Sequence, residues 1–588
     1  MSTPTLRDSR RVPGVNLLFD APGAVIDVGF SDADGAALIG AWQEQLARML
    51  DALGWEGAAV RVRRFPGGAS LFFSAPVDGL YAATEINEWA WAAAVAATNG
   101  GDPPTPDESR EDLEGFMRRE REPSLTALQR EAARRGVSFH VDHKGVSVGS
   151  GTGAQVFAAG DPRHPVAPRV GDVNWAAVHD VPTVLVTGSN GKTTTVRLLA
   201  AVVRAWGKVP GFNTTDNIVV GDEVLDEGDW SGPMGARAVL RNRRVEVAVL
   251  ETARGGILRR GLAVRRADAA IVTNVAEDHF GEWGIFDTRG IAETKLVVGH
   301  VARRLAINAD DPVLVEALEA ERRAGRVTAD VGYFALDPAN PVVRPHLARG
   351  GTAAVLEGGD LVFRHGARRW RVAAAKDVPI TLSGMARYNI ANALGTVLLA
   401  SAIGVPGDAI ARGLVGFKGT PKENPGRGHL FERDGARVIV DFAHNPHGMR
   451  ALIETARAMP AKRKIVVLGQ AGDRDDESIR GLARETWPWR PDRVILKEME
   501  KYLRGRRPGE ATGLIKDELV KLGADPSIFS HAPTELAAVE RALEEAGPGD
   551  LVLLPVHAER DGVLELMERP SHGDAVPERD AWIPSAAS

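Results

Sequence analysis

The sequence predicts an α/β protein with two parallel-sheet domains in tandem, preceded by a small α+β module. The chain of 588 residues is too long for one hydrophobic core, since single cores stop growing at about 250–300 residues. After Val181, apolar strand-like runs alternate with helical segments, and a second such series begins after Arg427. This pattern is typical of parallel sheets covered on both faces. The runs are TVLVTG, VEVAVLE, AAIVTN and RLAINAD, then ARVIVDFAH, KIVVLG, DRVILKE and DLVLLPV.

The first hundred residues predict the small α+β module. Its expected elements are, in order, a strand at 24–29, a helix at 36–53, strands at 58–65 and 69–75, and a helix at 81–97. The last helix holds Glu85 and Glu88, but no H-E-x-x-H arrangement accompanies them. We therefore interpret this helix as packing in the core rather than forming a hydrolytic site. The module is expected to position a substrate or to build an oligomer interface.

A charged segment follows the module. One helix is expected at 108–136, and its RREREP run is typical of a solvated helix face. Short strands are expected at 137–141 and 146–149, and the tail after 570 is expected to be poorly ordered.

Composition excludes several classes of function. The net charge of −6 lacks the basic excess that is usual for nucleic-acid binders. The absence of cysteine excludes disulfides, thiolate metal sites and cysteine nucleophiles. The polar N-terminus has no apolar core of a signal peptide, and the longest apolar run, Trp89–Ala97, is far shorter than the roughly 20 residues of a membrane span. We therefore expect a cytoplasmic enzyme without nucleic-acid or membrane partners.

The stretch VLVTGSNGKTTTVRLL predicts a phosphate-binding loop between a strand and a helix. Glycines at 188 and 191 would let backbone N–H groups converge, and the following helix would present its N-terminus to phosphate. Lys192 would reach the β- and γ-phosphates, and the Thr193 hydroxyl would sit on Mg²⁺. A purely structural turn would not need the lysine. A P-loop GTPase would need a base-reading N/T-K-x-D element, and VTNVAED lacks its lysine.

Polar side chains follow the next strands. Glu251 lies just past one buried run, Asn274, Asp278 and His279 lie past the next, and Lys295 lies on the following helix. Each alone has an ordinary reading as a surface or loop residue. The carboxyl ends of strands in open α/β sheets are where ligands bind, so their joint placement predicts one site beside Lys192.

Several motifs in order resemble the Mur ligase superfamily of ATP-dependent amide-forming enzymes. They are VTGSNGKTTT, LETARGG, NVAEDHFGEWG, KLVVG, INADD, GMARYNIANALG, NPGRG and DFAHNPHG. The phrases NTTDN, SGPMGARAVL, ETARGGILRRGL and LRGRRPGE most resemble the Mur-like C-terminal domain of cyanophycin synthetases, and the similarity covers about Pro182 to Leu566. The resemblance implies a P-loop central domain and a Rossmann-like C-terminal domain.

The resemblance also implies site residues, with ATP and Mg²⁺ as cofactors. In that family ATP phosphorylates a carboxylate and an amine displaces the phosphate. The implied catalytic residues are Lys192, Glu251, His279 and Lys295, the last at a position that is carbamylated in many relatives. The implied metal ligands are Thr193, Glu251 and His279. The implied nucleotide contacts are Gly188, Ser189, Asn190, Gly191, Lys192, Thr193, Thr194, Asn389, Asn392, Arg427, Asp441 and His444, with Tyr388 in place of the family's histidine.

Substrate contacts are implied for Thr214, Thr215, Asp216, Arg254, Glu498, Glu500 and Arg504. The acid is expected to be an aspartyl or similar group, in an amino acid or a small peptide. The amine is expected to be arginine, another amine or a preformed β-aspartyl dipeptide. In KEMEKYLRGRRPGE, Met499, Lys501 and Tyr502 reduce the negative charge of the acidic run that would suit a guanidinium.

The expected domains are an N-terminal module at 1–105, a linker with the remnant of an ATP-grasp start at 106–180, a central ATP-binding domain at 181–425, a C-terminal ligase domain at 426–570 and a tail at 571–588. The 20 or so residues left before the phosphate loop cannot hold an ATP-grasp domain, since domains need at least about 50 residues. We therefore expect one kind of amide bond per active site. Separately, we expect a homo-oligomer (dimer or tetramer). Two alternatives stay open: a catalytically weak ATP-binding scaffold, and a glutamate-chain ligase of the folylpolyglutamate or poly-γ-glutamate type.

Overall fold

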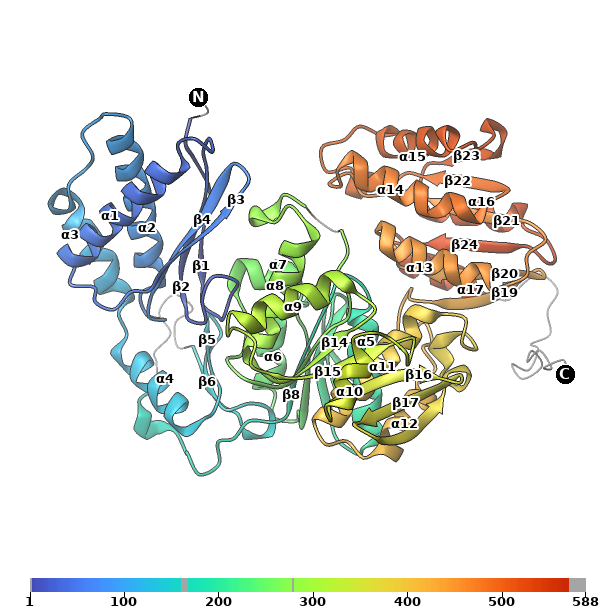
Figure 1. Ribbon diagram of the computed structural model, residues 1–588, viewed down its shortest axis with the longest axis horizontal. Helices are drawn as coiled ribbons and strands as arrows, with labels where there is room; N and C mark the ends of the chain where they lie inside the picture. Colours follow the sequence, from blue (N-terminus) through green and yellow to red (C-terminus); the bar gives the residue numbers. More distant parts are fainter. Residues whose placement is uncertain (1–2, 160–167, 278–279, 570–588) are drawn as a thin grey trace. The chain divides into compact units, whose positions relative to one another are not determined.

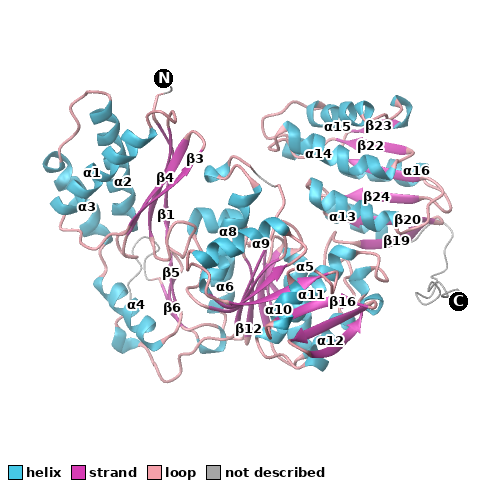
Figure 2. Ribbon diagram, viewed as in Figure 1, coloured by secondary structure: helices cyan, strands magenta, loops and turns pink. Residues whose placement is uncertain are grey.

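A computed structural model of the chain describes residues 3–159, 168–277 and 280–569, and it has the predicted α/β architecture (Figures 1 and 2). The chain forms two compact units. The first contains residues 1–377 and 389–417, and the second contains 378–388 and the residues from 418 onward. His279, Asp278 and the predicted tail lie outside the described residues.

The first unit begins with an antiparallel sheet in the order β1-β2-β4-β3. Figure 1 shows α1, α2 and α3 on one side of it. Trp42, Leu46 and Ile86 are fully or almost fully buried between these helices and the sheet. The elements are β1 (Thr5–Val12), β2 (Gly23–Gly29), β3 (Val60–Phe65), β4 (Gly68–Ser74), α1 (Gly35–Ala52), α2 (Leu80–Thr98) and α3 (Pro106–Glu120).

The predicted helix at 108–136 is wrong as a single element. The structure has α3 followed by α4 (Pro123–Arg135), because proline clashes with a preceding helical turn and forces the residue before it to extend. Pro123 instead starts the second helix, where a missing N–H costs nothing. A small antiparallel sheet follows, formed by β5 (Phe139–Asp142), β6 (Gly145–Val148) and β7 (Gln155–Ala158).

The centre of the first unit is a large sheet in the order β11-β10-β9-β12-β8-β13-β14-β15-β16-β17-β18. The strands from β9 to β16 in this order are parallel, and antiparallel hairpins extend both edges. The strands are β8 (Thr183–Thr187), β9 (Pro210–Asn213), β10 (Asn217–Val220), β11 (Glu223–Glu227), β12 (Val247–Glu251), β13 (Ala267–Val272), β14 (Ala302–Asn308), β15 (Asp330–Ala335), β16 (Thr352–Glu357), β17 (Asp360–His365) and β18 (Arg368–Ala374).

The strand order reverses at β8. The chain goes from β8 to β9 on one side, and later crosses from β12 to β13 on the other. Such a switch point opens a crevice at the carboxyl ends of the strands. The helices are α5 (Lys192–Ala205), α6 (Pro233–Arg241), α7 (Arg254–Arg260), α8 (Thr288–Val301), α9 (Pro312–Arg323), α10 (Val343–Ala348), α11 (Arg387–Ala402) and α12 (Gly407–Gly416).

The second unit is a six-stranded sheet in the order β19-β20-β24-β21-β22-β23, parallel except for β19. Alternate strand residues face opposite sides. One face packs on α13, α14 and α15, and the other on α16 and α17. The elements are β19 (His429–Arg433), β20 (Ala436–Asp441), β21 (Lys464–Leu468), β22 (Arg493–Lys497), β23 (Phe529–Ala532), β24 (Leu551–Pro555), α13 (Pro446–Arg457), α14 (Asp476–Thr486), α15 (Glu510–Lys521), α16 (Glu535–Glu545) and α17 (Arg560–Glu568).

None of the helices that the structure describes combines the length and the apolar character that crossing a bilayer requires.

Candidate active site

The glycine-rich turn at 188–191 connects β8 to α5 at the switch point of the large sheet. Gly188 and Gly191 have φ values of 152° and 82°. A Cβ on Gly188 would lie 1.8 Å from Thr273 Oγ1, and one on Gly191 would lie 2.3 Å from Asn392 Oδ1. Both positions therefore need glycine for conformation and for space. The turn leads directly into α5, whose N-terminal N–H groups favour an anion.

The turn is held by the residues that follow β13. The Ser189 N–H donates to Asn274 O and the Asn190 N–H donates to Asn274 Oδ1, each at 2.9 Å. Thr273 Oγ1 donates to Asn190 O at 2.6 Å. Sequence reasoning placed Asn274 near the site but did not identify this role, because the signal is a contact between two loops that are far apart in the chain.

Lys192 is the first residue of α5. Its Nζ donates to Gly188 O and to Ser189 O, each at 3.1 Å. The ammonium group therefore lies over the turn itself. Phosphate oxygens at this turn would offer it stronger, charge-assisted acceptors than the two carbonyls.

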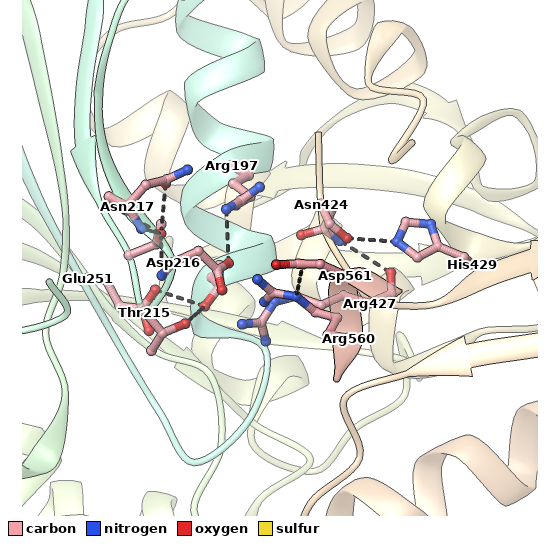
Figure 3. Close-up of polar contacts among 12 residues, drawn as sticks. Arg197, Thr215, Asp216, Asn217, Glu251, Asn424, Arg427, His429, Arg560 and Asp561 are labelled. Atoms are coloured by element: carbon pink, nitrogen blue, oxygen red, sulfur yellow. Dashed lines mark hydrogen bonds and ion pairs between the residues drawn. The ribbon is translucent and has the colours of Figure 1, made fainter. Parts of the chain in front are cut away.

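A buried carboxylate lies beside the start of α5. Glu251 ends β12 and is only 1% exposed. Its Oε2 accepts a hydrogen bond from Thr193 Oγ1 at 2.9 Å, and Thr193 Oγ1 also lies 3.3 Å from Thr215 Oγ1. Figure 3 shows Glu251 and Thr215 close to one another. The structure therefore brings three of the predicted site residues into contact.

The oxygen atoms of Glu251 and Thr193 are suitable ligands for a magnesium ion. Mg²⁺ prefers oxygen and is usually held by one or two carboxylates, with waters and substrate phosphates completing its shell. Within the described ranges, no group of three or more histidine, aspartate or glutamate side chains could hold a metal on its own. Glu251 and Thr193 would hold the ion together with nucleotide oxygens. His279, the other predicted ligand, lies outside the described residues.

The predicted substrate residues 214–216 have different surroundings. The Thr214 hydroxyl accepts from the backbone N–H groups of Asp216 and Asn217 at 3.1 and 3.2 Å, so it holds the turn. Asp216 accepts from Arg197 of α5 at 2.9 Å, as Figure 3 shows. The Thr215 hydroxyl reaches Thr193 Oγ1 at 3.3 Å. The turn thus presents one hydroxyl to the site, and its neighbours fix that hydroxyl's position.

Four other predicted residues of the first unit are buried on helices. Lys295 lies on α8 and Thr194 lies on α5, and both are almost fully buried. On α11, the Asn392 amide donates to Asn389 Oδ1 at 3.1 Å, and the same side chain contacts the Gly191 position. A fifth, Arg254, begins α7 and forms an ion pair with Glu282 at 2.6 Å.

A second cluster lies in the second unit, at the end of β20. Asp441 accepts a hydrogen bond from Tyr388 Oη at 3.3 Å. Burial raises the pKa of the Asp441 carboxyl to about 6, although the charge of Arg427 and the tyrosine hydrogen bond oppose the increase. His444 Nδ1 lies 3.0 Å from Phe442 O, and since a carbonyl only accepts, Nδ1 carries the proton. The Arg427 guanidinium lies 5.0 Å from the Phe442 ring centroid.

The segment before Arg427 is held by a buried asparagine. Asn424 O lies 2.9 Å from His429 Nε2, and Asn424 Nδ2 donates to Arg427 O at 3.3 Å, as Figure 3 shows. These contacts fix the backbone that carries the arginine.

The raised pKa of Asp441 predicts a pH dependence of stability. An unfolded aspartate has a pKa of about 3.9, so the native state binds this proton more tightly, and the resulting stability is present below about pH 4 and lost as pH rises through about 6. Relative to Asp441→Asn, the wild type should lose about 1–3 kcal/mol of unfolding free energy between pH 4 and 7. Urea denaturation of both proteins at several pH values measures this difference. If the unfolding free energies of the two proteins changed with pH in parallel, the raised pKa of Asp441 would be contradicted.

The predicted amine-recognition residues lie in the loop after β22. Glu498 accepts from Thr512 Oγ1 at 2.7 Å and from the Gly509 N–H at 3.1 Å, so it holds the start of α15. Arg504 forms an ion pair with Asp473 in the loop after β21. Glu500 is exposed. The loop is thus fixed at its ends, with Glu500 open to solvent.

A cavity of about 470 Å³ lies in the first unit, between the N-terminal module and α7. Most of α2 is buried in the core as expected, but Glu85 and Glu88 line this cavity. Burial, and then the charge of Glu88, raise the pKa of Glu85. The cavity wall therefore offers groups of both charges, because four arginines also line it: Arg10, Arg11, Arg259 and Arg260.

Comparison with known proteins assigns both α/β domains. Residues 186–400 match the model of the Mur ligase middle domain, and residues 426–555 match the model of the Mur ligase glutamate ligase domain. Cyanophycin synthetase from Crocosphaera subtropica is 39% identical over 380 residues, which are 64% of this chain and 42% of that protein. Cyanophycin synthetase from Geminocystis herdmanii is 36% identical over 73% of this chain and 49% of its own length. The chain therefore spans less than half the length of these relatives.

Among solved structures, E. coli FolC in complex with ADP aligns with 66% of this chain and 89% of its own, at 20% identity and a TM-score of 0.49.

Together, the two Mur ligase models match more than half of the chain. Apart from Asn424 and the cavity between α2 and α7, the site residues described above lie within the matched ranges. On these matches, the chain belongs to the Mur ligase family.

Proposed function

We propose that this protein is an ATP-dependent ligase that joins a carboxylate to an amine through an acyl phosphate. The observation that carries the proposal is the arrangement of the glycine turn, Lys192 and the Thr193–Glu251 contact at one switch point. A phosphate-binding turn beside a buried carboxylate suits transfer of a terminal phosphoryl group with a metal ion. The cyanophycin synthetase relatives support the same class of reaction.

In the proposed first step, a substrate carboxylate oxygen attacks the γ-phosphorus of ATP. An O–P bond forms, the bond from the γ-phosphorus to the bridging oxygen breaks, and ADP leaves. The ammonium of Lys192 would stabilise the negative charge that develops on the phosphoryl oxygens. Mg²⁺ bound near Glu251 would neutralise further phosphate charge.

In the second step, the amine nitrogen attacks the acyl carbon. A C–N bond forms, the C–O bond to phosphate breaks, and inorganic phosphate leaves while the amine loses its proton. Asp441 and His444 of the second unit are proposed to contact the nucleotide, as the family resemblance implies. Lys295 is proposed as the carbamylated position.

We propose an aspartyl-type acid and an amine of the arginine or β-aspartyl-arginine type. The name of these relatives, cyanophycin synthetase, supports this choice. The fixed loop that carries Glu498, Glu500 and Arg504 is the proposed amine contact, and Thr215, Asp216 and Arg254 are proposed on the acid side. A homo-oligomer remains part of the proposal.

A screen of substrate pairs tests the proposed function. ATP consumption is measured for acidic amino acids and peptides combined with arginine, β-aspartyl-arginine and glutamate, and products are identified by mass spectrometry. We expect ADP release that requires both an acid and an amine, with a product whose mass equals their sum less one water. ATP binding without turnover for any pair would favour the scaffold. Activity with glutamate alone would favour the glutamate-chain ligase.

A further inference from the structure

A buried lysine–glutamate pair lies at the carboxyl edge of the second unit's sheet. Lys497 ends β22 and Glu535 begins α16, and both side chains are fully buried. Lys497 Nζ donates to Glu535 Oε2 and also to Pro555 O. A buried ion pair usually stabilises a fold no more than apolar residues of the same volume. We therefore ask which neighbouring groups the pair holds in position.

The pair organises the turn that follows β24. Glu535 Oε2 accepts from the His557 N–H and Glu535 Oε1 accepts from the Glu559 N–H, each at 2.8 Å. Lys497 Nζ lies 3.2 Å from His557 Nδ1. His557 is thus held twice, at its backbone by the glutamate and at its ring by the lysine.

These contacts fix the tautomer of His557. Its Nε2 lies 3.1 Å from Ala443 O, and a carbonyl only accepts, so Nε2 carries the proton. Nδ1 is then the acceptor for the Lys497 ammonium. Burial, followed by the charges of Lys497 and His444, lowers the pKa of the His557 imidazole well below its usual range. The ring is neutral at physiological pH.

Ala443 lies in the loop between Asp441 and His444, so the bond from His557 holds the backbone that carries both. The Val556 N–H donates to Asp441 O at 2.8 Å, and Gln470 Nε2 donates to His444 O at 2.8 Å. The His557 ring also meets the Phe442 ring edge-on, with centroids 5.4 Å apart. Among these contacts, the bond to Ala443 is the one that a charged pair controls.

We infer that Lys497, Glu535 and His557 form a positioning network that fixes the backbone from Asp441 to His444 and so orients the groups that this loop presents to the reaction. The effect on turnover rests on the proposed function, because it requires that Asp441 and His444 serve the ligase reaction. The network itself does not depend on that proposal.

Kinetics test the effect on turnover, with ATP and the acid–amine pair found in the substrate screen. His557→Leu removes both ring bonds and should lower kcat by about 10- to 100-fold, the range expected when reacting groups are displaced by less than 1 Å, while KM for the amine changes little. His557→Gln should restore most of this rate, because its amide can donate to Ala443 O and accept from Lys497. His531→Gln, at the exposed His531 of β23, is the matched control and should behave as wild type.

A second measurement does not require activity. Long-range ¹H–¹⁵N NMR of histidine-labelled protein, with His557→Gln identifying the signal, should show the Nε2–H tautomer and no titration between pH 6 and 8. Lys497→Met should change the His557 nitrogen shifts and make this ring titrate at higher pH, because a neighbouring positive charge is removed.

The two measurements separate the possible failures. If no substrate pair is turned over but the tautomer is as expected, the proposed function fails and the network stands. If the wild type is active and a folded His557→Leu variant is equally active, the network does not orient the loop. A charged or Nδ1–H ring in the wild type overturns the inference directly. If His557→Leu does not fold, two other variants decide the question. A loss of rate in Lys497→Met together with a near-wild-type rate in His557→Gln supports the network.

Discussion

Lys192→Ala should reduce the rate of ATP-dependent product formation by about 100- to 1,000-fold, the usual cost of removing one preorganised group that stabilises charge in a transition state. The ammonium lies over the glycine turn, within 3.1 Å of two of its carbonyls. Turnover is measured with the substrate pair found in the screen. The thermal unfolding midpoint is followed in parallel.

The fold should survive this change, because the hydrogen bonds of the Lys192 side chain to Gly188 O and Ser189 O are made to backbone carbonyls at the start of a helix. Lys144→Ala provides a matched control, since Lys144 is an exposed lysine of the same unit in a loop between two strands. It should keep the wild-type rate. Full activity of Lys192→Ala would remove the phosphate-loop assignment and with it the proposed first step.

The buried parallel strands could be predicted from the sequence, whereas several other elements could not. β8, β12 and β13 are short apolar runs, which is the pattern that strands covered on both faces produce. β1 has the sequence TLRDSRRV and lies at the edge of its sheet, and β11 is exposed along its whole length. Edge strands are commonly polar, so neither carries the apolar signal that revealed the central strands.

The candidate site also contains some features that could be predicted from the sequence and others that could not. The sequence placed Lys192, Thr193 and Glu251 at strand and helix ends, and parallel topology then brings them together. The anchoring by Thr273 and Asn274 could not be predicted, because it depends on the left-handed conformation and close approach at Gly188. Local sequence does not specify contacts between loops that are far apart in the chain.

Lys497 illustrates a further limit. In DRVILKE a lysine at the end of an apolar run reads as the residue where the strand meets solvent, since lysine is almost never fully buried unless paired. Its partner Glu535 is 38 residues away. Only the pairing of β22 with its neighbours and the start of α16 place the two side chains together.

Glu251→Gln should remove most Mg²⁺-dependent turnover, by about 100-fold or more, because a neutral amide is a much poorer magnesium ligand than a carboxylate. The substitution keeps the size of the side chain and an oxygen that can accept from Thr193 Oγ1, which lies 2.9 Å from Glu251 Oε2. The nucleotide should still bind through the glycine turn and Lys192. The experiment therefore isolates the charge at the end of β12 from the geometry around it.

Turnover is measured as Mg²⁺ is titrated, and ADP binding is measured calorimetrically with and without the metal. Glu246→Gln is the matched control, because Glu246 directly precedes the same strand at its opposite end, where it forms an ion pair with Lys208 at 2.8 Å. That variant should keep the wild-type magnesium dependence. If Glu251→Gln also keeps it, the metal lies elsewhere. A residue that acts only as a ligand of the magnesium ion should leave metal-free ADP binding intact. If Glu251→Gln loses ADP binding in the absence of the metal as well as turnover, Glu251 shapes the nucleotide site rather than holding the ion.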